Sequence, residues 1–279
     1  MQMLAIPINS LFKITLYMNT ALKVAIISHD IAWEDKDDNL ITIAELLHKV
    51  DKDTDVVVLP ELFSTGFVSS VEKLHEMAET DDGKTILSLK RWAQHFNVAI
   101  CGSFLMNIGS DYYNRGFFVE PSGDVQYYNK RHLYNDDLEK RSYKEGVSKS
   151  PIVRYRGWNI SMQICYDIKF PVWCRNIDDE IDLLLVPANW PKDKEYEWKH
   201  LLIARAIENQ YYVVGANRSG SDDIGKYQNS YIFDFKGEDI STCSTKFPQI
   251  LYANLNKQEL REFRKLHSTS IDADKFIIL

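Results

Sequence analysis

Short apolar runs rich in β-branched residues alternate along the chain with longer amphipathic segments. The apolar runs include residues 23–28 (KVAIIS) and 56–59 (VVVL), and strands that are apolar throughout are typical of a sheet buried on both faces. Residues 39–50 and 197–209 instead carry apolar side chains at helical spacing, and residues 169–173 (KFPVW) are expected to begin another helix with the proline in its first turn. Because no linker or repeat interrupts this alternation, the pattern predicts an α/β domain in which helices cover a sheet core.

The two ends of the chain depart from this pattern. Residues 1–17 are apolar but lack the basic region and the cleavage site of a secretory signal, so we expect an N-terminal extension ahead of a single domain at residues 18–279. From about residue 257 the sequence becomes charged, which predicts a C-terminal tail of helix and loop. No stretch of about 20 apolar residues follows the N-terminal segment, so the sequence predicts no membrane partner and a cytoplasmic location.

Charge and cysteine content narrow the class of function. The 279 residues include 33 Lys and Arg against 40 Asp and Glu, a net charge of −7. This balance argues against a nucleic-acid partner, because duplex binding needs a basic face. The four cysteines contain no Cys-x-x-Cys pair, and the seven histidines form no His-Glu-x-x-His motif. The sequence therefore predicts no metal site, and each thiol has to be judged singly.

Three reactive side chains each stand at the carboxyl end of a predicted strand. Glu61 follows an apolar strand and a proline, and Lys130 ends the return strand of a predicted hairpin over residues 112–129. Cys165 is the last residue of a third predicted strand, at residues 158–165. Ligand and catalytic groups in α/β sheets gather at such strand ends. A thiolate is a nucleophile, a buried glutamate is suited to general-base catalysis, and a lysine can stabilise an oxyanion. Taken singly, each could instead be an ordinary packed or surface residue.

The motifs around these residues resemble the nitrilase, or carbon–nitrogen hydrolase, superfamily. They are residues 59–63 (LPELF), 128–133 (YNKRHL), 165–171 (CYDIKFP), 187–191 (PANWP) and 204–210 (ARAIENQ). The resemblance runs from Lys23 to about Tyr252. It implies a four-layer αββα sandwich, a homodimer or larger homo-oligomer, and no cofactor.

The resemblance also implies a role for each catalytic residue. Cys165 would attack an amide carbon, and Glu61 would act as base and acid in turn. Lys130 and the backbone N–H of Tyr166 would hold the oxyanion. The implied reaction is amide hydrolysis through a cysteine thioester.

A fourth catalytic residue of the family is a glutamate downstream of the lysine. Glu139 fits best, because residues 139–146 (EKRSYKEG) resemble the family's spacing from that glutamate to a glycine. Glu145 is the rival within the same segment. A solvated carboxylate on a helix face is the ordinary alternative for both.

The branch of the superfamily is indicated by three further segments. Residues 28–35 (SHDIAWED), 63–67 (FSTGF) and 170–175 (FPVWCR) are similar to the omega-amidases, which hydrolyse the terminal amide of 2-oxoglutaramate and 2-oxosuccinamate. The resemblance therefore implies a small 2-oxo acid amide as the substrate. Two alternatives stay open: a hydrolase of N-carbamoyl amino acids or other aliphatic amides in the same superfamily, and a non-enzymatic binding module with the same fold.

The substrate pocket is expected to be lined by aromatic and amide side chains. These are Phe67, Tyr166, Asn189 and Trp190. An anionic substrate also needs a cation or amide donors at its far end. Arg175 and Arg218 are the candidate cations, and the sequence does not place either of them.

Overall fold

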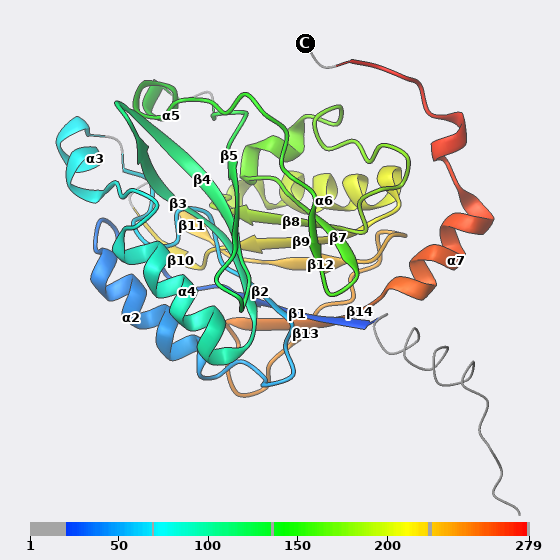
Figure 1. The fold of residues 1–279 in the computed structure, drawn as a ribbon, viewed down its shortest axis with the longest axis horizontal. Helices are drawn as coiled ribbons and strands as arrows, with labels where there is room; N and C mark the ends of the chain where they lie inside the picture. The colour runs from blue at the N-terminus through cyan, green and yellow to red at the C-terminus, as the bar shows by residue number, and fades with distance from the viewer. Residues whose placement is uncertain (1–20, 69, 135–136, 223–224, 278–279) are drawn as a thin grey trace, which may run out of the picture.

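The computed structural model describes residues 21–68, 70–134, 137–222 and 225–277, so the expected extension at residues 1–17 lies outside the described residues. Two β-sheets are stacked face to face, and helices cover their outer faces (Figure 1). This arrangement is the four-layer αββα sandwich that the sequence resemblance implied, and that prediction is confirmed.

The first sheet joins strands from both ends of the chain. β1 pairs in parallel with β2 and antiparallel with β14, so it lies between an early strand and a late one. β4 and β5 form the predicted hairpin, whose turn places Gly123 at φ +91°, a conformation that favours glycine. In sheet order, the seven strands are β13 (Thr242–Cys243), β14 (Ile250–Asn256), β1 (Ala21–Ile27), β2 (Val56–Val58), β3 (Ala99–Ile108), β4 (Asp111–Val119) and β5 (Val125–Asn129).

The second sheet has a parallel centre. β7, β8 and β9 are parallel neighbours, and every residue of β8 and β9 is buried, as expected for strands covered on both faces. In sheet order, its strands are β12 (Tyr231–Phe233), β9 (Tyr212–Asn217), β8 (Leu183–Ala188), β7 (Trp158–Met162) and β6 (Val153–Tyr155). A separate pair is formed by β10 (Gly220–Ser221) and β11 (Lys226–Tyr227).

Helices complete the outer layers. α2 (Lys36–Leu47) and α4 (Lys84–Phe96) bury their apolar faces on the first sheet, and α6 (Glu195–Asn209) packs on the second. Smaller helices are α3 (Val71–Met77) and α5 (Asp137–Ser142). Within the described ranges, none of the helices has the length and apolar character needed to span a membrane.

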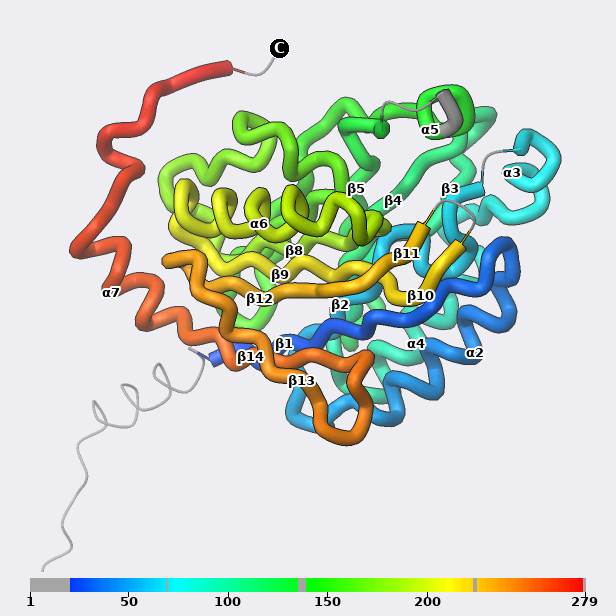
Figure 2. The backbone as a smooth tube through the Cα atoms, turned by 180° about the vertical axis from the view of Figure 1, so that it is seen from behind, coloured from blue at the N-terminus to red at the C-terminus, as the bar shows by residue number. Residues whose placement is uncertain are grey.

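The charged C-terminal segment begins as α7 (Lys257–His267), which continues directly from β14 at one edge of the molecule (Figure 2). Two buried cations hold this helix. Lys257 forms an ion pair with Asp182 and donates to the carbonyl of Gly157 at 2.6 Å. Arg264 lies 3.5 Å from the same aspartate and donates to the carbonyl of Gln210 at 2.8 Å. The start of the tail is thus tied to the second sheet.

The expected helix at residues 169–173 is absent. A short 3₁₀ helix, η1 (Cys165–Lys169), follows β7 instead, and the chain turns at Phe170, whose φ of −109° and ψ of 92° are extended. The reason is local: Phe170 precedes Pro171, and a residue before proline is disfavoured in the α conformation. The prediction used the preference of proline for a first helical turn and missed its effect on the preceding residue.

Candidate active site

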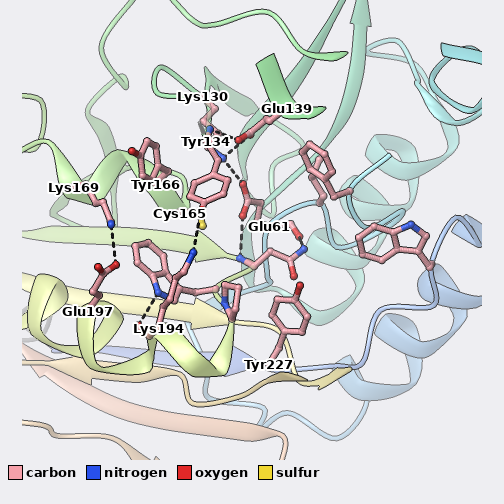
Figure 3. A pocket seen from close by; sticks show the side chains of 16 residues that line it. Glu61, Lys130, Tyr134, Glu139, Cys165, Tyr166, Lys169, Lys194, Glu197 and Tyr227 are labelled. Carbon is pink, nitrogen blue, oxygen red and sulfur yellow. Dashed lines mark hydrogen bonds and ion pairs between the residues drawn. The ribbon is translucent and has the colours of Figure 1, made fainter. Parts of the chain in front are cut away.

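The predicted catalytic residues meet at the carboxyl ends of strands from both sheets. Glu61 follows β2, Lys130 follows β5, Cys165 opens η1 after β7, and Asn189 follows β8. They line a cavity of about 180 Å³ (Figure 3). The four predicted catalytic residues and the four predicted substrate-binding residues all line it: Glu61, Phe67, Lys130, Glu139, Cys165, Tyr166, Asn189 and Trp190.

Lys130 is held between two carboxylates. Its Nζ donates to Glu61 Oε1 at 2.8 Å and to Glu139 Oε1 at 2.6 Å, and all three side chains are buried. Burial alone would lower the pKa of Lys130, but the charges of Glu139 and Glu61 raise it well above its usual value. The group is therefore a permanent cation. An ammonium has three N–H donors, so one remains available to a ligand in the cavity.

The two oxygens of Glu61 have different partners. Oε1 accepts from Asn114 Nδ2 at 2.7 Å and from Lys130, whereas Oε2 accepts from the backbone N–H of Asn189 at 3.0 Å. The Glu61 carboxylate also interacts with the thiol of Cys165. Because Oε1 already accepts two strong hydrogen bonds, Oε2 is the oxygen with room to accept a proton.

Cys165 stands in a left-handed backbone conformation, with φ at 46°. This conformation is uncommon for a residue with a side chain, and strained backbone of this kind clusters at functional sites. Burial and the charge of Glu61 raise the pKa of the Cys165 thiol well above its usual value, while Lys130 acts in the opposite direction. The resting thiol is therefore protonated and depends on a base for activation.

The structure distinguishes between the two candidate glutamates. Glu139 is buried and accepts from Lys130 through Oε1 and from the backbone N–H of Tyr134 through Oε2. Burial raises the pKa of Glu139, and the charge of Lys130 partly offsets that rise. Glu145 has a side chain that is 62% exposed and lies 3.3 Å from Arg131. Only Glu139 lines the cavity among the described residues of this segment.

The residues after Glu139 explain the spacing seen in the sequence. Gly146 donates its backbone N–H to the carbonyl of Lys130 at 2.8 Å. A Cβ at Gly146 would lie 2.1 Å from the carbonyl oxygen of Asn129, so the strand end that carries the lysine leaves room only for glycine. Tyr143 packs its ring 5.2 Å from that of Phe67 in the pocket wall. The segment therefore fixes both the lysine and the wall.

The groups around Lys130 determine how charge at Cys165 can be stabilised. Lys130 is surrounded by Glu61, Glu139 and Cys165, all of which can carry negative charge. In the described part of the chain, no three His, Cys, Asp or Glu side chains group as ligands for a metal ion. Lys130 is thus the cation available to stabilise negative charge at Cys165.

Neither of the two candidate arginines lines the cavity. Arg218 is fully buried, with NH2 at 2.9 Å from Asp30 and NH1 at 2.8 Å from Asp222, and its guanidinium lies 4.5 Å from the centre of the Tyr227 ring. It supports the pocket wall from behind. Arg175 is not among the described residues that line the cavity.

Several lining residues were not assigned to the site from the sequence. They include Trp33, Tyr134, Lys169, Lys194, Glu197 and Tyr227. Lys169 lies within the motif at residues 165–171, and Trp33 lies within the segment at residues 28–35, so a signal was present for these two. The other four lie in the loop after β5, in a short 3₁₀ helix at residues 192–194, in the first turn of α6 and in β11, where no spacing marks them.

Comparison with a family model described as Carbon-nitrogen hydrolase gives a match over residues 23–265. The chain belongs to the carbon–nitrogen hydrolase family. The resemblance seen in the sequence is thereby confirmed, and the chain is an enzyme that hydrolyses carbon–nitrogen bonds. The alternative of a non-enzymatic binding module is therefore not supported.

Individual relatives place this carbon–nitrogen hydrolase more narrowly. It is 38% identical over 262 residues to "Omega-amidase YafV" of Yersinia enterocolitica, covering 93% of this chain and 100% of the relative. It is 32% identical to "2-oxoglutaramate amidase" of Bacillus subtilis, over 87% of this chain and 93% of the relative. Among solved structures it resembles XC1258 of Xanthomonas campestris, a CN-hydrolase superfamily protein with an arsenic adduct in the active site. That match has a TM-score of 0.86 and 33% identity, and covers 92% of this chain and 99% of the other.

Proposed function

We propose that this hydrolase removes the terminal amide of small 2-oxo acid amides, such as 2-oxoglutaramate and 2-oxosuccinamate, and releases ammonia. The observation that carries the proposal is the meeting of Cys165, Glu61 and Lys130 in one small cavity. The names of the relatives, omega-amidase and 2-oxoglutaramate amidase, support the substrate class.

The first half of the proposed reaction forms a thioester. Glu61 takes the thiol proton of Cys165 as the sulfur bonds to the amide carbon, and the carbonyl oxygen becomes an oxyanion. The free N–H of Lys130 and the backbone N–H of Tyr166, the first after the nucleophile, stabilise that charge. When the carbon–nitrogen bond breaks, Glu61 returns the proton to nitrogen and ammonia leaves.

The second half of the proposed reaction hydrolyses the thioester. Glu61 takes a proton from water as the water oxygen bonds to the carbonyl carbon, and the same donors again hold the oxyanion. Breaking the carbon–sulfur bond releases the carboxylic acid, and the sulfur recovers a proton. Every charge in the cycle is carried by a side chain of this chain, so the proposed mechanism uses no cofactor.

The requirement for a free thiol at Cys165 bears on where in the cell the enzyme works. A cytoplasmic enzyme works in a reducing environment, where thiols persist. Cys165 must be a free thiol to react, and Cys101, Cys174 and Cys243 are free as well. We therefore propose a cytoplasmic location.

The substrate class is tested by ammonia release from a panel of compounds. The panel contains 2-oxoglutaramate, 2-oxosuccinamate, glutamine, an N-carbamoyl amino acid and an aliphatic nitrile. We expect 2-oxoglutaramate to be turned over well above glutamine, because the ammonium of glutamine would be desolvated in an aromatic pocket. If an N-carbamoyl amino acid is the best substrate, the omega-amidase assignment is wrong while the cysteine chemistry survives.

The nucleophile is tested separately from the substrate. We expect Cys165→Ser to lose nearly all turnover, because the thiolate is the attacking species. Matched serine variants of Cys101, Cys174 and Cys243 should retain most of it. A comparable loss from Cys174→Ser would contradict the assignment.

A further inference from the structure

Three lysines line the active-site cavity, and two of them are already neutralised. Lys130 is bonded to two carboxylates at the inner end. Lys169 forms an ion pair with Glu197, in which Nζ and Oε2 are 2.8 Å apart. Lys130 is committed to the reacting amide at the inner end, and Lys169 already has a carboxylate partner, so neither is the first choice for a distal carboxylate.

Lys194 is different, because its partner is neutral. Its Nζ donates to the hydroxyl of Tyr134 at 2.7 Å and lies 5.1 Å from the centre of that ring. No described Asp or Glu is in ion-pair contact with it, although the charges of Asp193 and Glu197 act on it from farther away. Hydrogen bonding to Tyr134 raises the pKa of Lys194, so the ammonium is charged at neutral pH. Two of its N–H donors remain unused.

The position of Lys194 is fixed by the cavity wall. It ends the 3₁₀ helix η2 (Lys192–Lys194), and its carbonyl accepts from Trp190 Nε1 at 2.9 Å. Its side chain reaches towards Tyr134 in Figure 3, while Lys169 is turned to Glu197. Both Lys194 and Tyr134 are solvent-accessible, whereas Lys130 is only 2% exposed. The lining lysine that lacks an ion-pair contact among the described residues therefore lies at the outer end of the cavity.

We propose that Lys194 binds the distal carboxylate of the substrate, with Tyr134 as a second donor. This inference rests on the proposed function. In this arrangement the carboxylate of the substrate binds Lys194 at the outer end of the cavity, and the amide carbon at the other end of the substrate lies at Cys165. Arg218 cannot take this part, since Asp30 and Asp222 already hold both of its terminal nitrogens. A charged hydrogen bond of this kind also selects against amides that lack the carboxylate.

The test compares two substrates that differ in one group. They are 2-oxoglutaramate and 4-oxopentanamide, in which a methyl group replaces the carboxylate. The measured quantity is the preference, the ratio of the two kcat/KM values. We expect Lys194→Met to lower the preference roughly 10- to 100-fold, as for loss of a hydrogen bond to a charged group, mainly by weakening the binding of the acidic substrate and so raising its KM. Lys194→Arg should keep most of the preference.

Two further variants make the result specific. Lys192→Met removes an exposed lysine of the same short helix and is the matched control, with the preference unchanged. Lys169→Met tests the other outer lysine. If Lys169→Met lowers the preference and Lys194→Met does not, the proposal is overturned. Equal losses on both substrates from Lys194→Met would also overturn it, because they would show a structural role.

A binding measurement separates recognition from turnover. Calorimetric titration of 2-oxoglutaramate into Cys165→Ala should give weaker affinity when Lys194→Met is added. If the wild-type enzyme hydrolyses 4-oxopentanamide and not 2-oxoglutaramate, the proposed function fails and this inference fails with it. If the wild type prefers 2-oxoglutaramate and Lys194→Met keeps that preference, the proposed function stands and only Lys194 is excluded.

Discussion

Among the described residues, two lysines are buried beside carboxylates, and one of them lines the active-site cavity. Lys130 lies between Glu61 and Glu139 at the inner end of the pocket. Lys257 pairs with Asp182 where α7 meets the second sheet. In each case an ammonium of less than a tenth exposure is held by at least one carboxylate that is also buried.

The charge balance of the two clusters differs. At α7 two cations, Lys257 and Arg264, meet two aspartates, Asp179 and Asp182, and backbone carbonyls accept further hydrogen bonds from both cations. At the pocket one cation faces two glutamates and a thiol, so a carboxylate is left in excess.

The difference indicates what makes a buried ion cluster reactive. A cluster whose charges balance holds its protons and its geometry. In a cluster that faces a cavity, an unused N–H of the cation can bind an oxyanion, and a carboxylate in excess can accept a proton. Burial of a lysine beside a carboxylate is therefore not itself a mark of catalysis.

Removing the cation from the reactive cluster should have the largest effect on turnover. We expect Lys130→Met to lower kcat/KM for 2-oxoglutaramate by at least roughly 10²- to 10³-fold, the usual loss for an oxyanion donor. The measurement is ammonia release by protein shown to be folded by circular dichroism. Near wild-type turnover would contradict the role given to Lys130.

Removing the charge of Glu139 should lower turnover less than removing Lys130 does. We expect Glu139→Gln to lower kcat roughly 10- to 100-fold, because the amide oxygen still accepts from Lys130 but carries no charge.

The same variant should change the dependence of stability on pH. Burial raises the pKa of Glu139 in the folded state, so the folded state binds that proton more tightly than the unfolded state. The free energy of unfolding of the wild type therefore falls as the pH rises from the unfolded pKa through the folded pKa. Glu139→Gln should lack this fall, as checked by urea denaturation across that pH range. An unchanged slope would refute the stated cause.

Removing the cation from the charge-balanced cluster at α7 should lower stability and leave turnover unchanged. We expect Lys257→Met to leave kcat of the folded protein close to wild type and to lower the free energy of unfolding by about 3–5 kcal/mol, because Asp182 keeps a buried charge with one partner fewer. Urea denaturation and initial rates on the same sample measure both quantities. A loss of kcat as large as that of Lys130→Met would remove the distinction between the two clusters.

Removing an exposed ion pair should have the smallest effect on turnover and stability. Lys84 pairs with Asp37 at 2.5 Å, with side chains that are 55% and 70% exposed. We expect Lys84→Ala to change neither kcat nor Tm measurably, since water and salt screen such pairs. A marked fall in Tm would mean that this pair contributes to the packing of α2 on α4.

Local signals in the sequence were sufficient for part of the fold and site. The β4–β5 hairpin could be predicted because apolar alternation flanks a turn at Gly123. Each of Glu61, Lys130 and Cys165 could be placed at or just past the end of a strand, and the family resemblance of their motifs assigned them to one site. Their catalytic roles stay predictions.

The outer end of the pocket could not be predicted in this way. Lys194 and Tyr134 meet only because η2 and the loop after β5 are folded against each other, across 60 residues of sequence. No motif joins them, and an isolated lysine is usually a solvated surface group. The pairing of β1 with β14 is likewise a long-range contact that no local pattern reports.

The position of β1 in the middle of the first sheet also sets an order of events during synthesis. β1 and its neighbour β2 leave the ribosome early, but β14, which ends at Asn256, leaves late. Until then one edge of β1 has no partner, and an open strand edge is prone to aberrant pairing. A chain that stops before Ile250 would leave this edge of β1 open to pairing with strands of other chains.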